Sequence, residues 1–253
     1  MESPKVTCIC ITNCKKVNLL RRAINCFKAQ TYSNKELLVV YANNDIDTKN
    51  LLLEEKDVNI KNCIFPSSIK TSYGAIKYHA LTLCDGDFIC MWDDWDWHHQ
   101  NRLEIQINSI ILTGKPASIL VNILFYDNYH KISYLSDMKM WENTLVFHKS
   151  LMNYVGFFDI KMNEDNNQIR FLINNNFLHP IIMPQMYIYV YNTKRIWSRM
   201  QFDKILLSSL KLKKESTIVI KKILEDKLPI QEASNALNCP EISHQFVYNK
   251  LNL

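Results

Sequence analysis

The stretch DFICMWDDWDWHHQNRLEIQ, residues 87–106, joins an apolar strand, an acidic turn and the start of a helix. Three carboxylates, those of Asp93, Asp94 and Asp96, follow the apolar run directly, and like charges at this spacing repel one another. A bound cation or another ligand would offset that repulsion, and so would solvent around a simple turn that caps a helix. The choice depends on where the fold places the turn.

Strands and helices alternate through the first half of the chain. Short apolar or β-branched runs predict strands, and helical spacing of apolar side chains predicts helices between them. The predicted strands cover residues 6–12, 36–41, 62–65 and 87–92, and the predicted helices cover residues 17–30, 48–56, 73–84 and 101–112. Such alternation implies an α/β fold with a mostly parallel sheet covered on both faces. Because ligands bind beyond the carboxyl ends of strands in such sheets, the acidic turn is a candidate site.

The second half of the chain has a different organisation. Strand-like runs with short connections cover residues 117–127, 131–135 and 144–149, a helical run covers 164–175, and a further strand-like run covers 186–191. From about residue 194 the chain becomes helical and rich in lysine. We therefore predict one domain over residues 1–193, with halves at 1–97 and 98–193, and a C-terminal helical appendage over 194–253.

Composition argues against several function classes. The net charge of +5 comes without a basic stripe of interleaved aromatic residues, which argues against a nucleic-acid partner. Four glycines in 253 residues argue against a P-loop or a dinucleotide fingerprint. The eight cysteines include no Cys-x-x-Cys pair, which predicts reduced, mostly buried thiols in a cytoplasmic protein. The N-terminal stretch is not a signal peptide, and no apolar run reaches the ~18 residues of a membrane span.

Three stretches, in the right order, resemble the family-2 glycosyltransferases, which are inverting enzymes of the GT-A fold that use nucleotide-activated sugars. The family's opening strand, helix and second strand match PKVTCICITNCKKVNLLRRAINCFKAQTYSNKELLVVY. Its Asp-x-Asp segment is similar to GDFICMWDDWDWHHQNRLEIQ, and its acceptor-side segment looks like WENTLVFHKSLMNYVGFFDIKMNEDNNQIRFL. The resemblance covers roughly residues 4–192 and implies a Rossmann-like, mostly parallel sheet flanked by helices.

The resemblance also implies a reaction and roles for individual residues. A sugar would move from a nucleotide-diphosphate donor to a glycan or lipid-linked acceptor, in surface polysaccharide or glycolipid synthesis. The family's Glu-Asp pair falls on Glu164 and Asp165, and we assign the general base to Asp165. A divalent cation, Mn²⁺ or Mg²⁺, would bind Asp94 and Asp96 and neutralise the diphosphate. The implied nucleotide-sugar contacts are Thr12, Asn13, Asn43, Asn44, Asp45, Lys77, Asp93, Asp94 and Trp95, and the acceptor-side residues are Trp141 and Glu142.

Two departures from the family pattern leave alternatives open. Trp95 stands where the usual metal-binding Asp is expected, so either Asp94-Trp95-Asp96 is the working motif or the metal is held differently. Tyr41 and Ala42 occupy the place of an Asp pair that reads the nucleotide base, and the Asn-Asn-Asp run after them could replace it. These departures support an alternative function, a catalytically weak nucleotide-sugar-binding or scaffold module. An Asp/His metallohydrolase is a third hypothesis, but the sequence offers no second His-Asp cluster for it.

The lysine-rich segment after residue 193 lies outside the resemblance. Its lysines are interleaved with apolar residues, as in a basic amphipathic helix that rests on an anionic membrane, where lipid-linked acceptors are found. The alternative is a set of helices packed on the core, with a solvated lysine face or a homodimer contact. We expect a cytoplasmic protein, and the membrane interpretation adds a peripheral contact at the inner face of the membrane.

Overall fold

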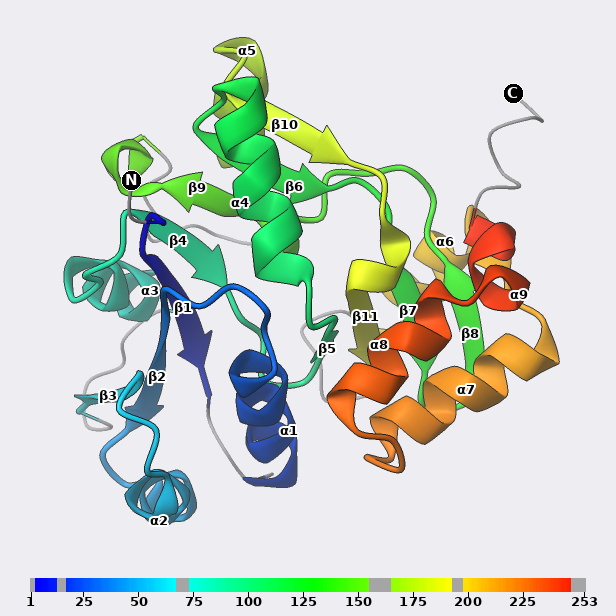
Figure 1. The fold of residues 1–253 in the computed structure, drawn as a ribbon, viewed down its shortest axis with the longest axis horizontal. Helices are drawn as coiled ribbons and strands as arrows, with labels where there is room; N and C mark the ends of the chain where they lie inside the picture. Colours follow the sequence, from blue (N-terminus) through cyan, green and yellow to red (C-terminus); the bar gives the residue numbers. More distant parts are fainter. Residues whose placement is uncertain (1–2, 13–16, 67–72, 155–164, 193–197, 247–253) are drawn as a thin grey trace.

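The strands of the computed structural model form two sheets (Figure 1). The model describes residues 3–12, 17–66, 73–154, 165–192 and 198–246. Within these residues, a seven-stranded sheet runs in the order β10 (Leu178–Ile181), β6 (Ala117–Leu120), β9 (Val146–His148), β4 (Phe88–Met91), β1 (Val6–Ile11), β2 (Lys35–Ala42), β3 (Ile60–Phe65). A five-stranded sheet runs in the order β12 (Leu210–Lys211), β8 (Ile132–Leu135), β7 (Leu124–Asp127), β11 (Tyr187–Tyr191), β5 (Trp97–His98).

Parallel pairing dominates the large sheet. β1 pairs in parallel with β2 and with β4, and β2 pairs in parallel with β3. At the other side of the sheet β10 and β6 are parallel, while β9 is antiparallel to both β4 and β6. The prediction of a mostly parallel α/β sheet is therefore confirmed. The parallel pairing brings the carboxyl ends of β1, β2 and β4 to one edge.

Helices cover both faces of this sheet, as the alternation of strands and helices predicts. The helices of the first half are α1 (Val17–Lys28), α2 (Ile46–Glu54), α3 (Tyr73–Thr82) and α4 (Arg102–Thr113), and α5 (Asp165–Asn174) follows in the second half. In β1, Cys8 and Cys10 point into a core shared with α1 and α4, whereas Ile9 points into a core shared with α3 and α5. This strand alternation is what a strand buried on both faces requires.

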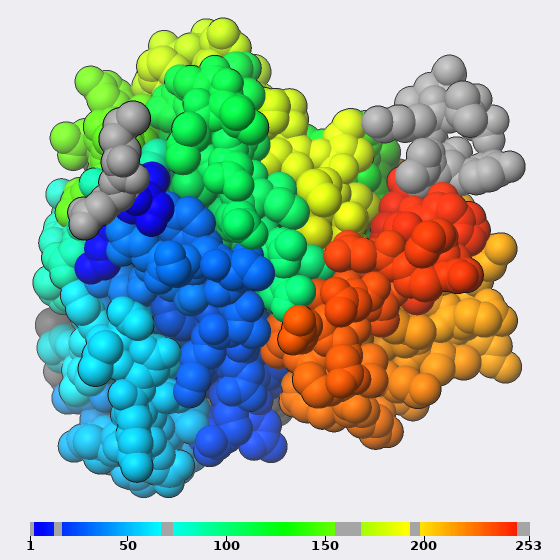
Figure 2. Space-filling model, viewed as in Figure 1, coloured from blue at the N-terminus to red at the C-terminus, as the bar shows by residue number. Residues whose placement is uncertain are grey.

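The segment after residue 193 is largely helical, as predicted, and it packs on the core. Its helices are α6 (Arg199–Leu207), α7 (Lys214–Leu224), α8 (Ile230–Asn238) and α9 (Pro240–Ser243). Ile220 and Ile223 of α7 and Leu237 of α8 are buried in the same core as α1 and α4. Figure 2 shows the orange part of this segment, which holds α7 and α8, beside the blue α1. The lysines of α7 stay on the outside, since Lys221 and Lys222 are exposed. The domain boundary at residue 193 itself stays a prediction.

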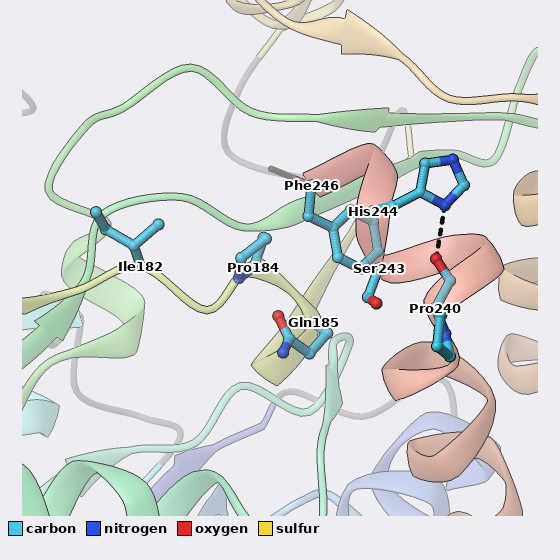
Figure 3. Close-up of a pocket in the computed structure, with 7 residues that line it drawn as sticks. All are labelled: Ile182, Pro184, Gln185, Pro240, Ser243, His244 and Phe246. Carbon is cyan, nitrogen blue, oxygen red and sulfur yellow. Dashed lines mark hydrogen bonds between the residues drawn. The ribbon is translucent and has the colours of Figure 1, made fainter. Parts of the chain in front are cut away.

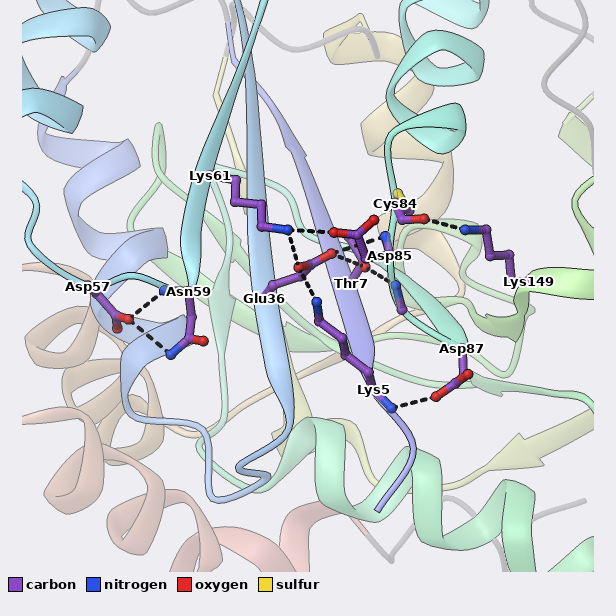
Figure 4. A network of polar contacts seen from close by, with 11 residues as sticks. Lys5, Thr7, Glu36, Asp57, Asn59, Lys61, Cys84, Asp85, Asp87 and Lys149 are labelled. Atoms are coloured by element: carbon purple, nitrogen blue, oxygen red, sulfur yellow. Dashed lines mark hydrogen bonds and ion pairs between the residues drawn. The ribbon is translucent and has the colours of Figure 1, made fainter. Parts of the chain in front are cut away.

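A buried carboxylate ties the amino ends of three strands together (Figure 4). Glu36, near the start of β2, is 2% exposed and forms ion pairs with Lys5 at 2.6 Å and with Lys61 of β3 at 2.9 Å. The hydroxyl of Thr7 in β1 donates a third hydrogen bond at 2.6 Å. Burial alone would raise the pKa of Glu36, but hydrogen bonds from Lys5, Thr7 and Lys61 hold it at about 2. This network fixes the sheet at the edge opposite the acidic turn.

Two further features concern the cysteines and the length of the helices. The described cysteines are all free, and six of them are buried, as expected for reduced thiols in a core. Among the described helices, none combines the length and the apolar composition that crossing a bilayer requires.

Candidate active site

Residues predicted to bind the nucleotide sugar meet where β1 and β4 end. Thr12 follows β1, and its hydroxyl donates a hydrogen bond of 2.7 Å to Oδ2 of Asp94, which follows β4. Thr12 is 3% exposed and Asp94 is 7% exposed, so this hydrogen bond is largely shielded from solvent. A hydrogen bond to a buried carboxylate is stronger than one between neutral groups. The structure thus joins two predicted site residues that lie far apart in the sequence; the neighbouring Asn13 lies outside the described residues.

The acidic turn itself is closed by its own side chain. The backbone N–H of Trp95 donates to Oδ1 of Asp93 at 2.9 Å, which is an Asx turn. The guanidinium of Arg22, on α1, donates to the carbonyl oxygen of Trp95 at 2.7 Å. Trp95 therefore helps to shape the turn through its backbone, at the place where the family pattern has a metal-binding Asp.

Tyr73, the first residue of α3, brings further predicted residues to this edge. The ammonium group of Lys77 lies over its ring, 5.0 Å from the centroid. The pKa of Tyr73 is raised by burial and by the nearby charges of Asp93, Asp94 and Glu142. Tyr73 thus has Lys77 packed over its ring, and the charges of Asp93 and Asp94 are near enough to affect its hydroxyl.

Tyr73 is a site residue that the sequence analysis missed. It lies one helical turn before Lys77, and residues four apart on a helix are neighbours on its surface. That spacing was the available signal. Because Lys77 was predicted to lie near the donor, the residue four positions before it on the same helix face could have been predicted there too.

Trp141 and Glu142, predicted on the acceptor side, lie in different surroundings. Trp141 is 4% exposed and packs edge-on against Phe125, with 5.2 Å between the ring centroids. Glu142 begins the short helix η1 (Glu142–Thr144) and is partly exposed. Its charge acts on Tyr73 together with those of Asp93 and Asp94. Glu142 thus belongs to the acidic edge, and the acceptor role of both residues stays a prediction.

Asp96 has surroundings unlike those of Asp94. It is fully buried, and Oδ1 accepts a hydrogen bond of 2.9 Å from the backbone N–H of Val190. The hydroxyl of Tyr187, also in β11, donates to Oδ2. The same hydroxyl accepts a bond of 2.7 Å from the amide of Asn143, which follows Glu142 in η1. These contacts suit a carboxylate that holds the acidic turn against the second sheet, so Asp94 is the better cation ligand of the predicted pair.

His98 supports the other side of the turn. Nδ1 of its ring accepts a hydrogen bond of 2.6 Å from Nη1 of Arg102, because a guanidinium can only donate. The other nitrogen, Nε2, therefore carries the proton and donates to the carbonyl oxygen of Asp93 at 3.1 Å. The ring stacks on Trp92 with centroids 3.8 Å apart. Burial and the charge of Arg102 lower the pKa of His98, which keeps the ring neutral.

The residues after β2 follow the same edge. Asn43 and Asn44 are exposed just beyond the end of the strand. Asp45 caps α2, because its carboxylate accepts a hydrogen bond of 3.0 Å from the backbone N–H of Thr48. A contact between these residues and a nucleotide base stays a prediction.

The predicted general base cannot be placed in the same way. Asp165 is the first residue of α5, but its side chain is not among the described parts, and Glu164 lies outside the described residues. The assignment of the base to Asp165 therefore stays a prediction that rests on the family resemblance.

The donor groups at the edge suit a cation that binds together with its substrate. In the described part of the chain, no cluster of three or more His, Cys, Asp or Glu side chains is arranged to hold a metal. A Mg²⁺ ion commonly takes one or two carboxylates, and substrate phosphates and water supply its other ligands. Asp93 and Asp94 are adjacent carboxylates of this kind, so they fit a cation that arrives with a diphosphate.

A cavity of about 290 Å³ lies elsewhere in the molecule (Figure 3). It separates η3 (Pro184–Met186) from α9 and η4 (His244–Phe246). Its lining comprises Ile182, Pro184, Gln185, Pro240, Ser243, His244 and Phe246. Elements other than those that carry the acidic edge form this cavity.

Comparison with known proteins agrees with this geometry. The family model for glycosyl transferase family 2 matches residues 8–179. No curated protein matches the chain. Structure comparison finds TarS 1–349 of S. aureus in complex with UDP-GlcNAc, with a TM-score of 0.61 and 13% identity over 98% of this chain and 76% of that one. The mannosyltransferase PcManGT from Pyrobaculum calidifontis, in complex with GDP-Man and Mn²⁺, gives a TM-score of 0.57 and 13% identity over 93% and 74%. At these identities the likeness shows the fold.

Proposed function

The chain belongs to glycosyl transferase family 2 and is a glycosyltransferase, and from this premise we propose how its acidic edge works. A sugar moves from a nucleotide-diphosphate donor to a hydroxyl group of a glycan or lipid-linked acceptor, with inversion at the anomeric carbon. One observation carries the proposal: Thr12 and Asp94 are hydrogen-bonded at the carboxyl ends of the parallel strands β1 and β4. That is where ligands bind in open α/β sheets.

The donor would lie across the ends of β1, β2 and β4. Its nucleoside would face the exposed Asn43 and Asn44, and its diphosphate would face Lys77 and Asp94. Two structural neighbours bind different donors, UDP-GlcNAc in TarS and GDP-Man in PcManGT. The proposal therefore names a nucleotide-diphosphate sugar and leaves the base to the experiment below.

A divalent cation would join the donor at Asp94, with Asp93 as the second carboxylate. Bound there, it would neutralise the charge that builds on the leaving diphosphate. PcManGT was solved with Mn²⁺, which supports a cation in this fold. Asp96, the second ligand of the original prediction, is given a positioning role instead, since both of its oxygens accept hydrogen bonds from β11.

The chemistry requires one proton acceptor and one leaving group. The acceptor hydroxyl oxygen attacks the anomeric carbon from the face opposite the diphosphate, and its proton passes to the carboxylate that we assign to Asp165. The bond from the anomeric carbon to the phosphate oxygen breaks, and its electron pair leaves with the nucleoside diphosphate. Lys77 would stabilise the charge of the leaving diphosphate directly, and Asp94 would contribute by holding the cation that neutralises it.

The experiment is a turnover assay with a panel of UDP- and GDP-sugars in the presence of Mn²⁺. We expect at least one donor to release its nucleoside diphosphate while its sugar passes to an added glycan or to water. Asp165→Asn keeps the side-chain shape, and we expect it to lower kcat by about two orders of magnitude with little change in donor affinity. Asp85→Asn, an exposed carboxylate paired with Lys61 at the opposite edge of the sheet, serves as the control for a carboxylate outside the reaction.

Three outcomes separate the alternatives. Turnover that falls in Asp165→Asn but not in Asp85→Asn supports the proposal. Donor binding without turnover, in wild type and variants alike, would favour the binding or scaffold module that Trp95 in the metal position suggests. A chain that neither binds nor turns over any of these nucleotide sugars would contradict the proposal.

A further inference from the structure

A pocket of about 260 Å³ lies between α6 and the segment that follows β8. We call it the lysine pocket, and its lining comprises Asp137, Lys139, Trp141, Lys204, Ile205 and Ser208. Two of these side chains are cations that come from distant parts of the sequence and meet at the pocket. Its floor includes Trp141, which is 4% exposed and held by packing against Phe125.

The charges of the lysine pocket favour an anion. Lys139 and Lys204 are exposed, and within the described residues neither forms an ion pair with a carboxylate. The ammonium group of Lys139 instead lies 5.4 Å from the ring centroid of Trp141. One carboxylate, that of Asp137, also lines the pocket, and its Oδ1 accepts a hydrogen bond of 2.7 Å from the backbone N–H of Met138. The lining therefore keeps a net positive charge.

The pocket lies next to the acidic edge along the chain. Trp141 lines the pocket, and two residues later the amide of Asn143 donates to the Tyr187 hydroxyl, which donates to Asp96 of the acidic turn. The short segment of residues 139–143 thus has the lysine pocket at one end and the acidic edge at the other. A molecule whose hydroxyl group reaches the acidic edge could place another of its groups in the pocket.

Exposed apolar residues adjoin the lining residues along the chain. Met138 is 57% exposed beside Lys139, and Leu207 is 88% exposed beside Ser208. Leu210 is 37% exposed. It pairs with Leu135, the last residue of β8, after which the segment that lines the pocket begins. Cations with apolar neighbours of this kind suit a phosphate group that is attached to a less polar body.

We propose that the lysine pocket binds a phosphate group of the acceptor, through the ammonium groups of Lys139 and Lys204. The inference rests on the proposed function, because it assigns a chemical class to the acceptor of that reaction. The phosphate could belong to a lipid headgroup or to a water-soluble glycan phosphate, and both present the same anion to the lysines.

The test compares the wild-type chain with Lys139→Gln/Lys204→Gln. A second double variant, Lys221→Gln/Lys222→Gln, removes two exposed charges from α7 and is the matched control. One arm measures binding of glycerol 3-phosphate by NMR line broadening, and the other measures co-sedimentation with vesicles of phosphatidylglycerol and phosphatidylcholine. All substituted lysines are exposed, so each variant is expected to fold, and a thermal melt checks this.

We expect the pocket variant to lose about tenfold or more in affinity in at least one arm, and the control variant to lose little. Loss in both arms indicates a water-soluble phosphate group, and loss in the vesicle arm alone indicates a lipid headgroup. Equal losses in the two double variants, or wild-type binding to neither probe, would overturn the proposal. Binding of a nucleotide-diphosphate sugar should be unchanged in the pocket variant, so a failure here is distinct from a failure of the proposed function.

Discussion

The hydroxyl of Thr12 and the carboxylate of Asp94 meet at 2.7 Å across the ends of two neighbouring parallel strands. Thr12 follows β1 and Asp94 follows β4, so 82 residues of sequence separate the two partners. The contact orients one oxygen of the carboxylate that we propose as the cation ligand. A positioned carboxylate is more useful to a metal and a diphosphate than a mobile one, because less ordering remains to be done on binding.

Removing the Thr12 hydroxyl should therefore weaken donor binding. We expect Thr12→Val to raise the dissociation constant of the nucleotide-diphosphate sugar about tenfold, in line with a hydrogen bond to a charged group. Thr113→Val removes an exposed hydroxyl at the end of α4 and should leave donor affinity unchanged. Titration calorimetry in Mn²⁺ gives both values, and equal affinities in the two variants would show that the Thr12 bond does not matter for the donor.

Tyr187 should matter for both folding and turnover. Tyr187→Phe leaves the buried carboxylate of Asp96 and the amide of Asn143 without this partner, and we expect a loss of about 1–3 kcal/mol in the free energy of unfolding. Because Asp96 belongs to the acidic turn, kcat should fall as well. The matched control is Tyr191→Phe, since the buried hydroxyl of Tyr191 has no hydrogen-bond partner within the described structure. Urea unfolding should show a clear loss for the first variant and about none for the second.

Stability should fall when the solution becomes mildly acidic. Burial lowers the pKa of His98 well below 6.5 and that of His99 to about 4. In the unfolded chain both rings take up a proton near pH 6.5, so the stability that their neutral forms contribute is complete above that pH and is lost as the pH falls below it. Between pH 7.5 and 5.5 we expect the free energy of unfolding to drop by about 1.4 kcal/mol for each ring.

Urea unfolding at the two pH values measures that drop. His99→Gln keeps a polar side chain that does not titrate, and it should remove about half of the pH dependence. A free energy of unfolding that is the same at pH 7.5 and 5.5 would contradict the buried, neutral state of both rings.

The network at the opposite edge of the sheet should respond to pH in its own range. Glu36 has a pKa held at about 2, so its contribution to stability is complete above about 4.5 and is lost as the pH falls toward 2. Glu36→Gln should cost about 2–4 kcal/mol at pH 7, because Lys5 and Lys61 would lose a buried partner. Glu55→Gln, which breaks a more exposed pair with Lys28, should cost less than about 1 kcal/mol. Similar losses of unfolding free energy in the two variants would show that the buried network stabilises the fold no more than an exposed ion pair does.

The alternation of strands and helices was enough to predict the mostly parallel sheet and the position of the acidic turn at its carboxyl edge. Period and length of apolar runs carry that information, because each strand buried on both faces must be apolar along its whole length. The same local patterns predicted that Trp92 continues the strand into the core, and it is 1% exposed. Thr12, at the end of one predicted strand, and Asp94, just beyond another, were named as site residues from the family resemblance.

The differences between neighbouring carboxylates could not be predicted. Asp94 and Asp96 look alike in the sequence, but one bonds to Thr12 and the other is covered by Tyr187 and Val190 of a strand that comes about 90 residues later. Such partners depend on how two sheets pack. Tyr73 was missed for a similar reason, because its role comes from carboxylates on other elements.

The proposed donor site is tested most directly by the effect of Mn²⁺ on nucleotide-diphosphate binding in Asp94→Ala and in wild type. A thermal-shift titration with UDP and GDP measures it, since a ligand that binds the folded chain raises its melting temperature. We predict that at least one nucleotide stabilises wild type strongly in Mn²⁺ and weakly in EDTA, and that Asp94→Ala loses the Mn²⁺-dependent part. Equal stabilisation of wild type with and without the cation, or an unchanged response in Asp94→Ala, would contradict the account.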